Sequence, residues 1–351
     1  GYTLISRVLG FIRDVTIASG LGASMYSDAF FVAFKLPNYL RRLFAEGAFN
    51  SAFVPQYAGM LAADGEATAK RFAAEAMSFL LLVLFIVSGV LIAIMPWFMY
   101  ILAPGFSENP DKFELTIQLT RITMPYIIFI SLVSLLGGIL NSSGKFAAVA
   151  ATPIIMNLCL IIIPWLIEDI TPNGAYGLAI AVMASGVLQW LWLVYFCRKL
   201  GMLPKWVRPK LTPDVKKLML LMAPVALGAG VAQINLVIDT IIASQFHSGV
   251  SYLYYADRIN ELPLAVIGIA LGTALLPMLS RQIREGKMEQ AYHSQNRALE
   301  LGLFLSMPAA IAILVIAEPI IRVMFERGEF GALETIATYR ALMAFAIGLP
   351  A

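Results

Sequence analysis

The chain has 351 residues, of which 60% are hydrophobic and 13% charged, and its mean hydropathy is +0.80. Soluble domains carry about 25% charged residues, so this composition excludes an ordinary soluble domain and indicates an integral membrane protein. The formal net charge of +3 says little about partners, whereas the placement of the charges says more.

Apolar runs that are long enough to cross a bilayer recur along the chain. About 20 helical residues span the hydrocarbon, and the alternating pattern of a barrel strand is missing, so we expect an all-α, polytopic protein. Its length suggests about nine complete transmembrane helices and part of a tenth. The expected crossings are residues 2–22, 27–58, 76–103, 115–140, 147–167, 174–197, 218–246, 251–280, 298–325 and 335–351. Because the chain starts without methionine, shows no cleavable signal peptide and stops within an apolar run, we expect a fragment.

Basic residues gather in alternate loops. The loops after the second, fourth, sixth and eighth crossings hold fourteen lysines and arginines, whereas the other loops hold only Lys112 and Arg327. Lys and Arg near helix ends are retained on the cytoplasmic side, so this asymmetry predicts a cytoplasmic N-terminus.

The longest basic loop, residues 198–217, could also be interpreted as a nucleic-acid patch. Orientation and contact with anionic membrane lipids account for its charges, so we expect no nucleic-acid partner. Cys159 and Cys197 are two isolated cysteines in apolar context, and they predict neither a disulfide nor a metal site.

An internal repeat is visible when the chain is shifted against itself. A shift of 222 aligns Asn38 with Asn260, Leu40 with Leu262 and Pro55 with Pro277, and a shift of 223 aligns Pro96 with Pro319 and Gly105 with Gly328. A unit of six crossings gives two parallel lobes with a substrate site between them. We therefore predict an N-terminal transmembrane lobe at 1–200, a cytoplasmic connector at 201–216 and an incomplete C-terminal lobe at 217–351. Chance coincidence of helix-ending prolines and glycines is the alternative.

Ionisable residues lie inside segments that are otherwise apolar enough to enter the membrane. Each such residue at mid-membrane costs roughly 3 kcal/mol on insertion scales, so it usually faces a protein interior or a watery cavity. Six cations are opposed by five acids, which predicts a polar chamber with a small cationic excess. The set comprises Arg7, Arg13, Asp14, Asp28, Lys35, Arg41, Arg42, Glu46, Asp257, Arg258 and Glu261.

Helical spacing places some of these charges together. Positions seven apart nearly superimpose, so we expect Arg7 and Asp14 on one face with Arg13 to one side. The same spacing stacks Asp28, Lys35 and Arg42, although Pro37 should kink that helix. Internal salt bridges that bind the helices together are one explanation. The other is an anionic ligand, because guanidinium groups match phosphate oxygens with two parallel donors.

Asp239 is a further intramembrane acid, in the run INLVIDTIIASQF. It could bind a coupling cation or a proton, or form a hydrogen bond to a neighbouring helix. Coupling to sodium ions, to protons or to the membrane potential stays open, and we expect no cofactor and no metal.

Three strings are distinctive: SRVLGFIRD at 6–14, SDAFFVAFKLPNYLRRLFAEGAFNSAFVP at 27–55, and YYADRINELP with GTALLP at 254–277. They resemble the MurJ (MviN) lipid II flippases, in the superfamily that also contains multidrug exporters. The resemblance implies a fourteen-helix protein of the bacterial inner membrane that moves undecaprenyl-diphosphate-linked peptidoglycan precursor outward. It also implies final helices with a lipid-tail groove, which lie beyond Ala351.

The resemblance further implies residue roles. The central-cavity residues of the family map onto Arg7, Arg13, Asp28, Arg41 and Arg258, with Lys35 and Arg42 in the same strings as further substrate-binding candidates. Asp14, Glu46, Asp257 and Glu261 would support or gate the cavity, and alternating access of two lobes would carry the lipid across. The expected partners are lipid II, membrane lipids and the cell-wall synthesis machinery, with the protein a monomer.

Three other functions compete with this interpretation. An exporter of amphipathic drugs, or a flippase for another lipid-linked oligosaccharide, could use the same architecture. A membrane enzyme acting on lipid diphosphates would need a base, a nucleophile or a metal cluster beside the arginines, but the only histidines, His247 and His293, lie near helix ends. We therefore predict no catalytic residues and no enzyme. An assembly scaffold without transport would leave the arginines unexplained.

Overall fold

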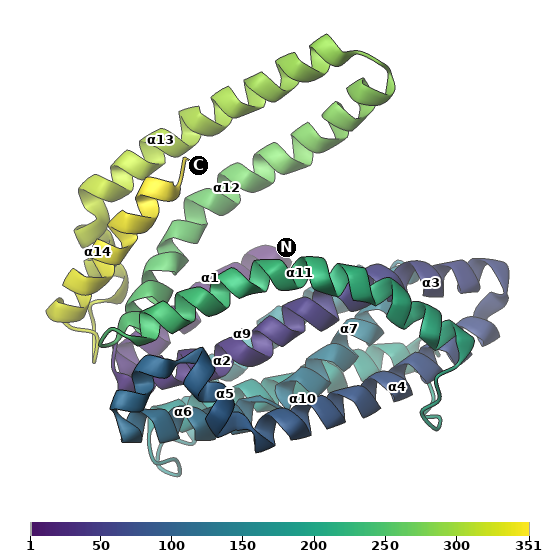
Figure 1. The fold of residues 1–351 in the computed structure, drawn as a ribbon, viewed down its shortest axis with the longest axis horizontal. Coiled ribbons are helices and arrows are strands. Elements are labelled where there is room, and N and C mark those ends of the chain that lie inside the picture. Colours follow the sequence, from purple (N-terminus) through teal and green to yellow (C-terminus); the bar gives the residue numbers. More distant parts are fainter. Residues whose placement is uncertain (1, 351) are drawn as a thin grey trace. The chain divides into compact units, whose positions relative to one another are not determined.

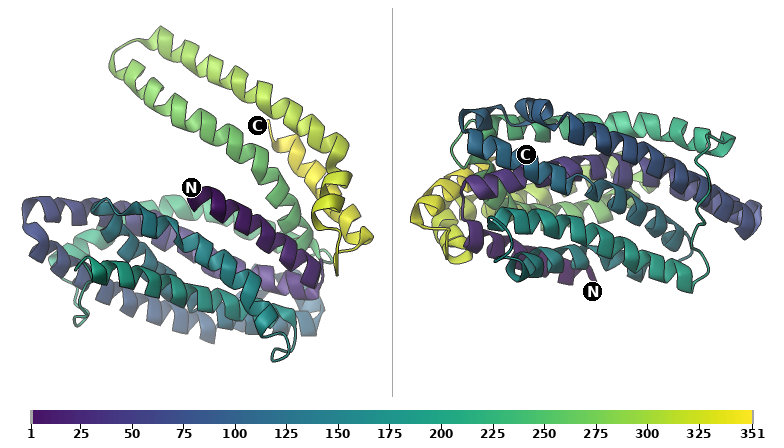
Figure 2. Two further views of the ribbon diagram at one scale, coloured as in Figure 1. Left: turned by 180° about the vertical axis from the view of Figure 1, so that it is seen from behind. Right: turned by 90° about the horizontal axis from the view of Figure 1, so that it is seen from below.

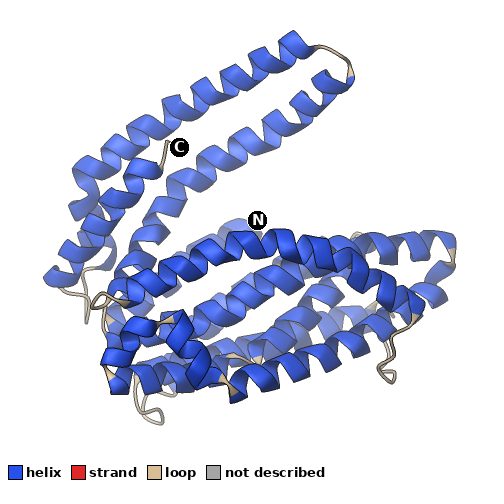
Figure 3. Cartoon of the chain, viewed as in Figure 1, coloured by secondary structure: helices blue, strands red, loops and turns tan. Residues whose placement is uncertain are grey.

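The computed structural model describes the backbone of residues 2–350, and their side chains except those of 43–46, 232, 266–274 and 276. Helices make up most of this part of the chain, as Figure 3 shows. Within it, the only strand-like pairing is an isolated bridge between Arg327 and Phe330. The expected all-α architecture is therefore confirmed.

The chain divides into two compact units, each of which is described by itself. Unit 1 contains residues 1–17 and 24–250, and unit 2 contains residues 18–23 and 251–351. Helix α1 (Tyr2–Leu21) contributes to both units. The boundary at 250 lies beyond the predicted connector at 201–216, because the helix after that connector packs within unit 1. The predicted lobes at 1–200 and 217–351 follow from the sequence repeat, and this division stays a prediction.

Unit 1 is a helical bundle (Figures 1 and 2). Its main neighbouring pairs are α9 with α10, α2 with α6, α7 with α10, and η1 with α11. Its elements are α2 (Met25–Leu40), the π-helix η1 (Arg41–Phe49), α3 (Asn50–Ala63), α4 (Gly65–Ala93), α5 (Met95–Leu102), the 3₁₀-helix η2 (Pro104–Glu108), α6 (Pro110–Thr123), α7 (Tyr126–Ser142), α8 (Phe146–Ala150), α9 (Thr152–Leu166), α10 (Gly174–Lys199) and α11 (Pro213–Ser244).

Unit 2 is formed by α12 (Gly249–Arg284), α13 (Met288–Phe325) and α14 (Ala332–Gly348), together with the end of α1. Tyr255 packs against Phe325 and Phe330 at ring-centroid distances of 5.2 and 5.3 Å, and all three side chains are buried. The Tyr255 hydroxyl donates to the carbonyl of Gly22 at 3.2 Å. This aromatic cluster therefore attaches the end of α1 to the turn between α13 and α14.

Two glycines that the sequence repeat aligns occupy similar positions against helix ends. In unit 1, the Gly105 amide donates to Ser244 Oγ at 3.2 Å, and a Cβ on Gly105 would meet the Ser244 backbone. In unit 2, Gly328 has a φ of +58°, and a Cβ there would meet the Ser19 backbone. Since each turn lies directly against backbone, only glycine fits at either position.

Six segments of the described chain are long and apolar enough to cross a membrane. They are Gly65–Ala93, Pro110–Ser142, Phe146–Leu166, Gly174–Lys199, Pro213–Ser244 and Met288–Phe325, and they correspond to six of the expected crossings. The other expected crossings are also helical. Helix α1 contains Arg7, Arg13 and Asp14, and α14 has 17 residues, whereas the apolar part of α12 includes residues whose side chains lie outside the described ones.

The second expected crossing, 27–58, is composed of three consecutive helical elements, α2, η1 and α3. Pro37, which we expected to kink the helix, lies inside α2, and the wider π-turns start only at Arg41. A proline within a helix leaves the carbonyl four residues earlier without its N–H partner. Here that carbonyl belongs to Ala33, and Thr123 Oγ1 of α6 donates to it at 2.9 Å. A side chain of a neighbouring helix thus accommodates the proline.

Candidate functional site

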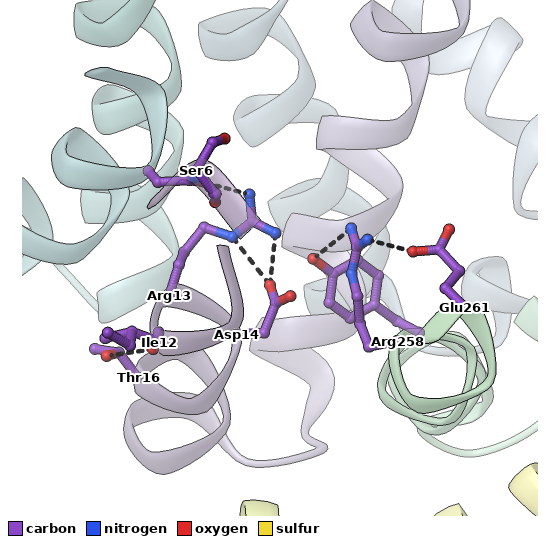
Figure 4. Close-up of polar contacts among 9 residues, drawn as sticks. Ser6, Ile12, Arg13, Asp14, Thr16, Arg258 and Glu261 are labelled. Atoms are coloured by element: carbon purple, nitrogen blue, oxygen red, sulfur yellow. Dashed lines mark hydrogen bonds and ion pairs between the residues drawn. The ribbon is translucent and has the colours of Figure 1, made fainter. Parts of the chain in front are cut away.

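A buried polar cluster lies on α1 in unit 1, at Arg13 (Figure 4). The Nε and Nη2 atoms of Arg13 donate to Asp14 Oδ1 at 2.9 and 2.7 Å, and Nη1 donates to Asn157 Oδ1 of α9 at 2.9 Å. The Asn157 amide in turn donates to the Ser6 carbonyl at 2.9 Å. Arg13 is 6% exposed and Asp14 2%, so the ion pair is largely removed from water.

This arrangement differs from the predicted one on α1. Asp14 pairs with its neighbour Arg13, whereas Arg7 is exposed. Much of the start of α1 is exposed whichever way its side chains point, since Leu4 and Val8, near Arg7, are exposed as well. Arg13 and Asp14, in a later turn, are buried. The seven-residue spacing gives the direction of a side chain but does not reveal which helices cover each turn.

A second buried ion pair joins α2 to α6. Lys112 Nζ lies 2.6 Å from Asp28 Oδ2, and the same ammonium group lies 3.9 Å from the centroid of the Phe106 ring. Asp28 is 0% exposed and Lys112 8%. The Asp28 carboxylate thus has a protein cation as its partner, which supports a structural role, while contact with a substrate stays a prediction.

Lys35 and Tyr39 of α2 both contact Thr240 of α11. Lys35 Nζ donates to Thr240 Oγ1 at 3.3 Å, and the Tyr39 hydroxyl lies 3.1 Å from the same oxygen. Asp239, the candidate coupling residue, is the preceding residue of α11, and its side chain is exposed. The predicted stack of Asp28, Lys35 and Arg42 is therefore distributed over different partners, since Asp28 pairs with Lys112 and Arg42 is exposed.

Arg41 lines a cavity of about 150 Å³ within unit 1. Its polar lining includes Asn50, Asn141, Gln189 and Thr152, and no carboxylate is among the described lining residues. Gln189 and Thr152 are buried, whereas Arg41, Asn50 and Asn141 are half-buried. Glu46, the predicted supporting residue on η1, has a side chain that lies outside the described residues.

In unit 2, α12 carries the remaining predicted residues. Arg258 Nη1 donates to Glu261 Oε2 at 2.9 Å, and Nη2 donates to the Tyr254 hydroxyl at 3.3 Å (Figure 4). The Arg258 guanidinium also lies 5.0 Å from the centroid of the Tyr254 ring. Glu261 is exposed, and both Asp257 and Arg258 are half-buried. These contacts orient a guanidinium that is still accessible to solvent.

Sequence reasoning missed several residues of these clusters, among them Lys112 and Asn157. Lys112 was assigned to a loop, although it lies in the first turn of α6 after Asn109, whose side chain accepts from the Lys112 amide at 3.1 Å. Asn157 is neutral, and it lies in an apolar run where polar side chains usually form hydrogen bonds between helices. That exception to the apolar pattern was the signal that could have identified it.

The clusters contain guanidinium groups, which are donors that can bind anions. Within the described part of the chain, no group of three or more His, Cys, Asp and Glu side chains is arranged to hold a metal ion. Accessible and buried guanidinium groups, by contrast, are the donors that match phosphate and carboxylate oxygens.

Comparison with known protein families shows to which family the chain belongs. Residues 17–351 match the family model described as lipid II flippase MurJ. The chain belongs to the MurJ family. A probable lipid II flippase MurJ of Rhizobium meliloti (strain 1021) is 43% identical over 355 residues, and the alignment covers 100% of the chain and 66% of that relative. One of Rickettsia prowazekii (strain Madrid E) is 39% identical, with 99% of the chain and 68% of the relative covered.

Solved structures agree with this MurJ assignment. A lipid II flippase MurJ in an inward closed conformation has a TM-score of 0.84 at 28% identity, covering 99% of the chain and 72% of that structure. An inward-facing multidrug resistance MATE transporter of the MOP superfamily has a TM-score of 0.75 at 16% identity, covering 98% and 78%. The second likeness shows a shared fold only. The predicted family is confirmed, and the chain is a multi-pass membrane protein that spans about two thirds of its MurJ relatives.

Proposed function

We propose that this protein translocates lipid II across the bacterial inner membrane. The observation that carries the proposal is the match of residues 17–351 to the MurJ family, together with relatives that bear the same name over nearly the whole chain. That family name describes transport of a lipid, so the proposed activity moves a molecule without making or breaking its bonds.

The proposed mechanism is alternating access by two lobes around a cationic cavity. Lipid II carries a diphosphate, and guanidinium groups fit its oxygens with paired donors. We assign the diphosphate to Arg7, Arg13 and Arg258, with Arg41 supporting the phosphate site or the inner gate. The exposed Arg7 and the half-buried Arg258 are accessible to a ligand, which supports this assignment. Arg13 is buried and held by Asp14 and Asn157, so its exposure to the diphosphate would require these contacts to rearrange.

The test measures flipping of a labelled lipid II in vesicles containing the purified full-length protein. We expect Arg7→Ala and Arg258→Ala to abolish translocation, and Arg258→Lys to restore little of it, because an ammonium loses the bidentate geometry. Arg297→Ala is a matched control, since Arg297 pairs with Glu300 on an exposed part of α13. Normal translocation by the Arg7 and Arg258 variants would refute the cationic cavity.

Three further features complete the proposal. The charge asymmetry of the loops supports a cytoplasmic N-terminus. Asp239, exposed on α11, is proposed to bind a coupling sodium ion or proton, with the membrane potential as the alternative source of energy. The protein is proposed to act as a monomer beside the cell-wall synthesis machinery and to need no cofactor.

A further inference from the structure

An apolar groove runs between α4 and α11 in unit 1. Its volume is about 170 Å³, and its lining extends from Ala76 to Val87 on α4 and from Val215 to Ala226 on α11. Phe49 and Ile127 also line it, and every lining residue is apolar. Both helices are among the segments that are long and apolar enough to cross a membrane, which would place the groove within the hydrocarbon.

The length of the groove matches one leaflet of a bilayer. Eleven helical steps at 1.5 Å each give a groove about 16 Å long on both helices. The hydrocarbon core is about 30 Å thick, so a single leaflet contributes about half of that. The length of the groove along the helices therefore matches the span of one acyl chain in a single leaflet.

A basic strap, residues 200–212, crosses α4 where the groove begins. The Val207 amide donates to Ser78 Oγ at 3.2 Å, and Thr212 Oγ1 donates to Glu75 Oε2 at 2.8 Å. Nearby, Gln56 Nε2 donates to the Asp214 carbonyl at 3.1 Å. These hydrogen bonds fix the strap and the start of α11 beside Ala76, the first groove residue on α4.

The strap has the composition of a membrane surface anchor. Lys205, Arg208 and Lys210 are exposed, and Trp206 is 63% exposed. Basic side chains next to a membrane attract anionic headgroups, and tryptophan prefers the interface between water and hydrocarbon. Positive charge thus lies at the surface end of an apolar groove that continues into the hydrocarbon.

We infer that this groove is a binding site for one anionic phospholipid of the bilayer. An acyl chain would lie between α4 and α11, and the phosphate headgroup would bind the side chains of Lys205, Arg208 and Lys210. Charge complementarity selects an anionic lipid over a zwitterionic one, and the one-leaflet length selects a phospholipid over a longer polyprenyl tail. The site uses none of the residues assigned to the lipid II cavity, so it is independent of the proposed function.

Native mass spectrometry of the delipidated full-length protein tests the site. Phosphatidylglycerol and phosphatidylethanolamine with the same acyl chains are titrated separately, and we expect one phosphatidylglycerol to bind in preference. The triple variant Lys205→Gln, Arg208→Gln, Lys210→Gln should weaken that binding at least roughly tenfold. Ala223→Trp, which fills the groove, should weaken the binding of both lipids.

Two control variants separate the site from general effects. Arg281→Gln with Arg284→Gln removes exposed charge from another basic segment, and Leu220→Trp places the same tryptophan side chain at an exposed position of α11 outside the groove. Both should bind phosphatidylglycerol as the parent protein does, and thermal unfolding in detergent should show that all variants are folded. Equal binding of the two lipids, or unchanged binding by the triple and Ala223→Trp variants, would overturn the inference. Displacement of phosphatidylglycerol by an equimolar polyprenyl diphosphate would overturn it as well.

Discussion

Lys112 Nζ and Asp28 Oδ2 lie 2.6 Å apart, although 84 residues separate them in the chain. Neither side chain has appreciable contact with water, and each ion compensates the charge of the other. Breaking a buried pair by removing one partner costs about 3–5 kcal/mol, whereas replacing both partners with apolar groups is often neutral. The pair therefore provides a way to separate a structural role of Asp28 from substrate binding.

The first prediction concerns this pair. Asp28→Asn should lower the free energy of unfolding by roughly 3 kcal/mol, and combining it with Lys112→Met should restore most of the loss. Reversible unfolding in detergent measures the stability. If flipping also recovers in the double variant, the Asp28 charge is structural; if flipping remains absent in a stable double variant, Asp28 contacts the substrate.

The second prediction concerns the Arg13 cluster. Asn157→Leu removes the acceptor for Arg13 Nη1 and should destabilise the protein by about 1–3 kcal/mol, because a buried donor loses its partner. Flipping should fall as well, since α9 no longer positions the guanidinium. Leu158→Ala is the neighbouring control, as its side chain is 39% exposed. If Asn157→Leu had the same thermal unfolding midpoint as the parent protein, the proposed importance of this hydrogen bond would be contradicted.

The predicted helices agree with the structure where the apolar runs are long, and less well where polar partners decide the details. The expected crossing at 174–197 corresponds to α10, and 115–140 lies within α6 and α7. Hydropathy was sufficient there, since the membrane imposes helices on such runs. It could not reveal η1 or the accommodation of Pro37, which depends on Thr123, a residue 86 positions later.

The candidate site was predicted as a set of charges but not as a set of pairs. Intramembrane cost identified Arg13, Asp28 and Arg258 as residues that need a polar environment. Periodicity gives only the direction of a side chain on its own helix, whereas the pairing of Asp28 with Lys112 depends on which helices are neighbours. That information lies in the tertiary packing.

The third prediction concerns Gly328, which faces backbone in unit 2. Gly328→Ala should be destabilising, because the residue has a φ of +58° and a Cβ would meet the Ser19 backbone. Gly201→Ala is the control: it has a similar φ of +68° but no heavy atom within 4 Å of the added Cβ. We expect Gly201→Ala to cost about 1 kcal/mol and Gly328→Ala clearly more. Equal losses in thermal stability would show that the close contact is unimportant.

The fourth prediction separates Asp239 from its neighbour Thr240. Asp239→Asn should reduce the stimulation of flipping by an imposed sodium gradient if this carboxylate binds the coupling ion. Thr240→Val removes the hydroxyl that contacts Lys35 and Tyr39, and should lower stability by about 1 kcal/mol while leaving the sodium response intact. Vesicles with and without the gradient give the readout, and an unchanged response in Asp239→Asn would assign the energy source elsewhere.

Helix α1 is one unbroken element whose first part belongs to unit 1 and whose last turn belongs to unit 2. The Glu329 amide donates to the Ser19 carbonyl at 2.9 Å, and Tyr255 donates to Gly22, so that last turn is attached on two sides. The end of α1 is therefore fixed to the α13–α14 turn within unit 2, while the part up to Ile17 belongs to unit 1. Arg13 and Asp14 lie directly before Ile17 on the same helix, so a bend of α1 at Ile17 would move this buried ion pair.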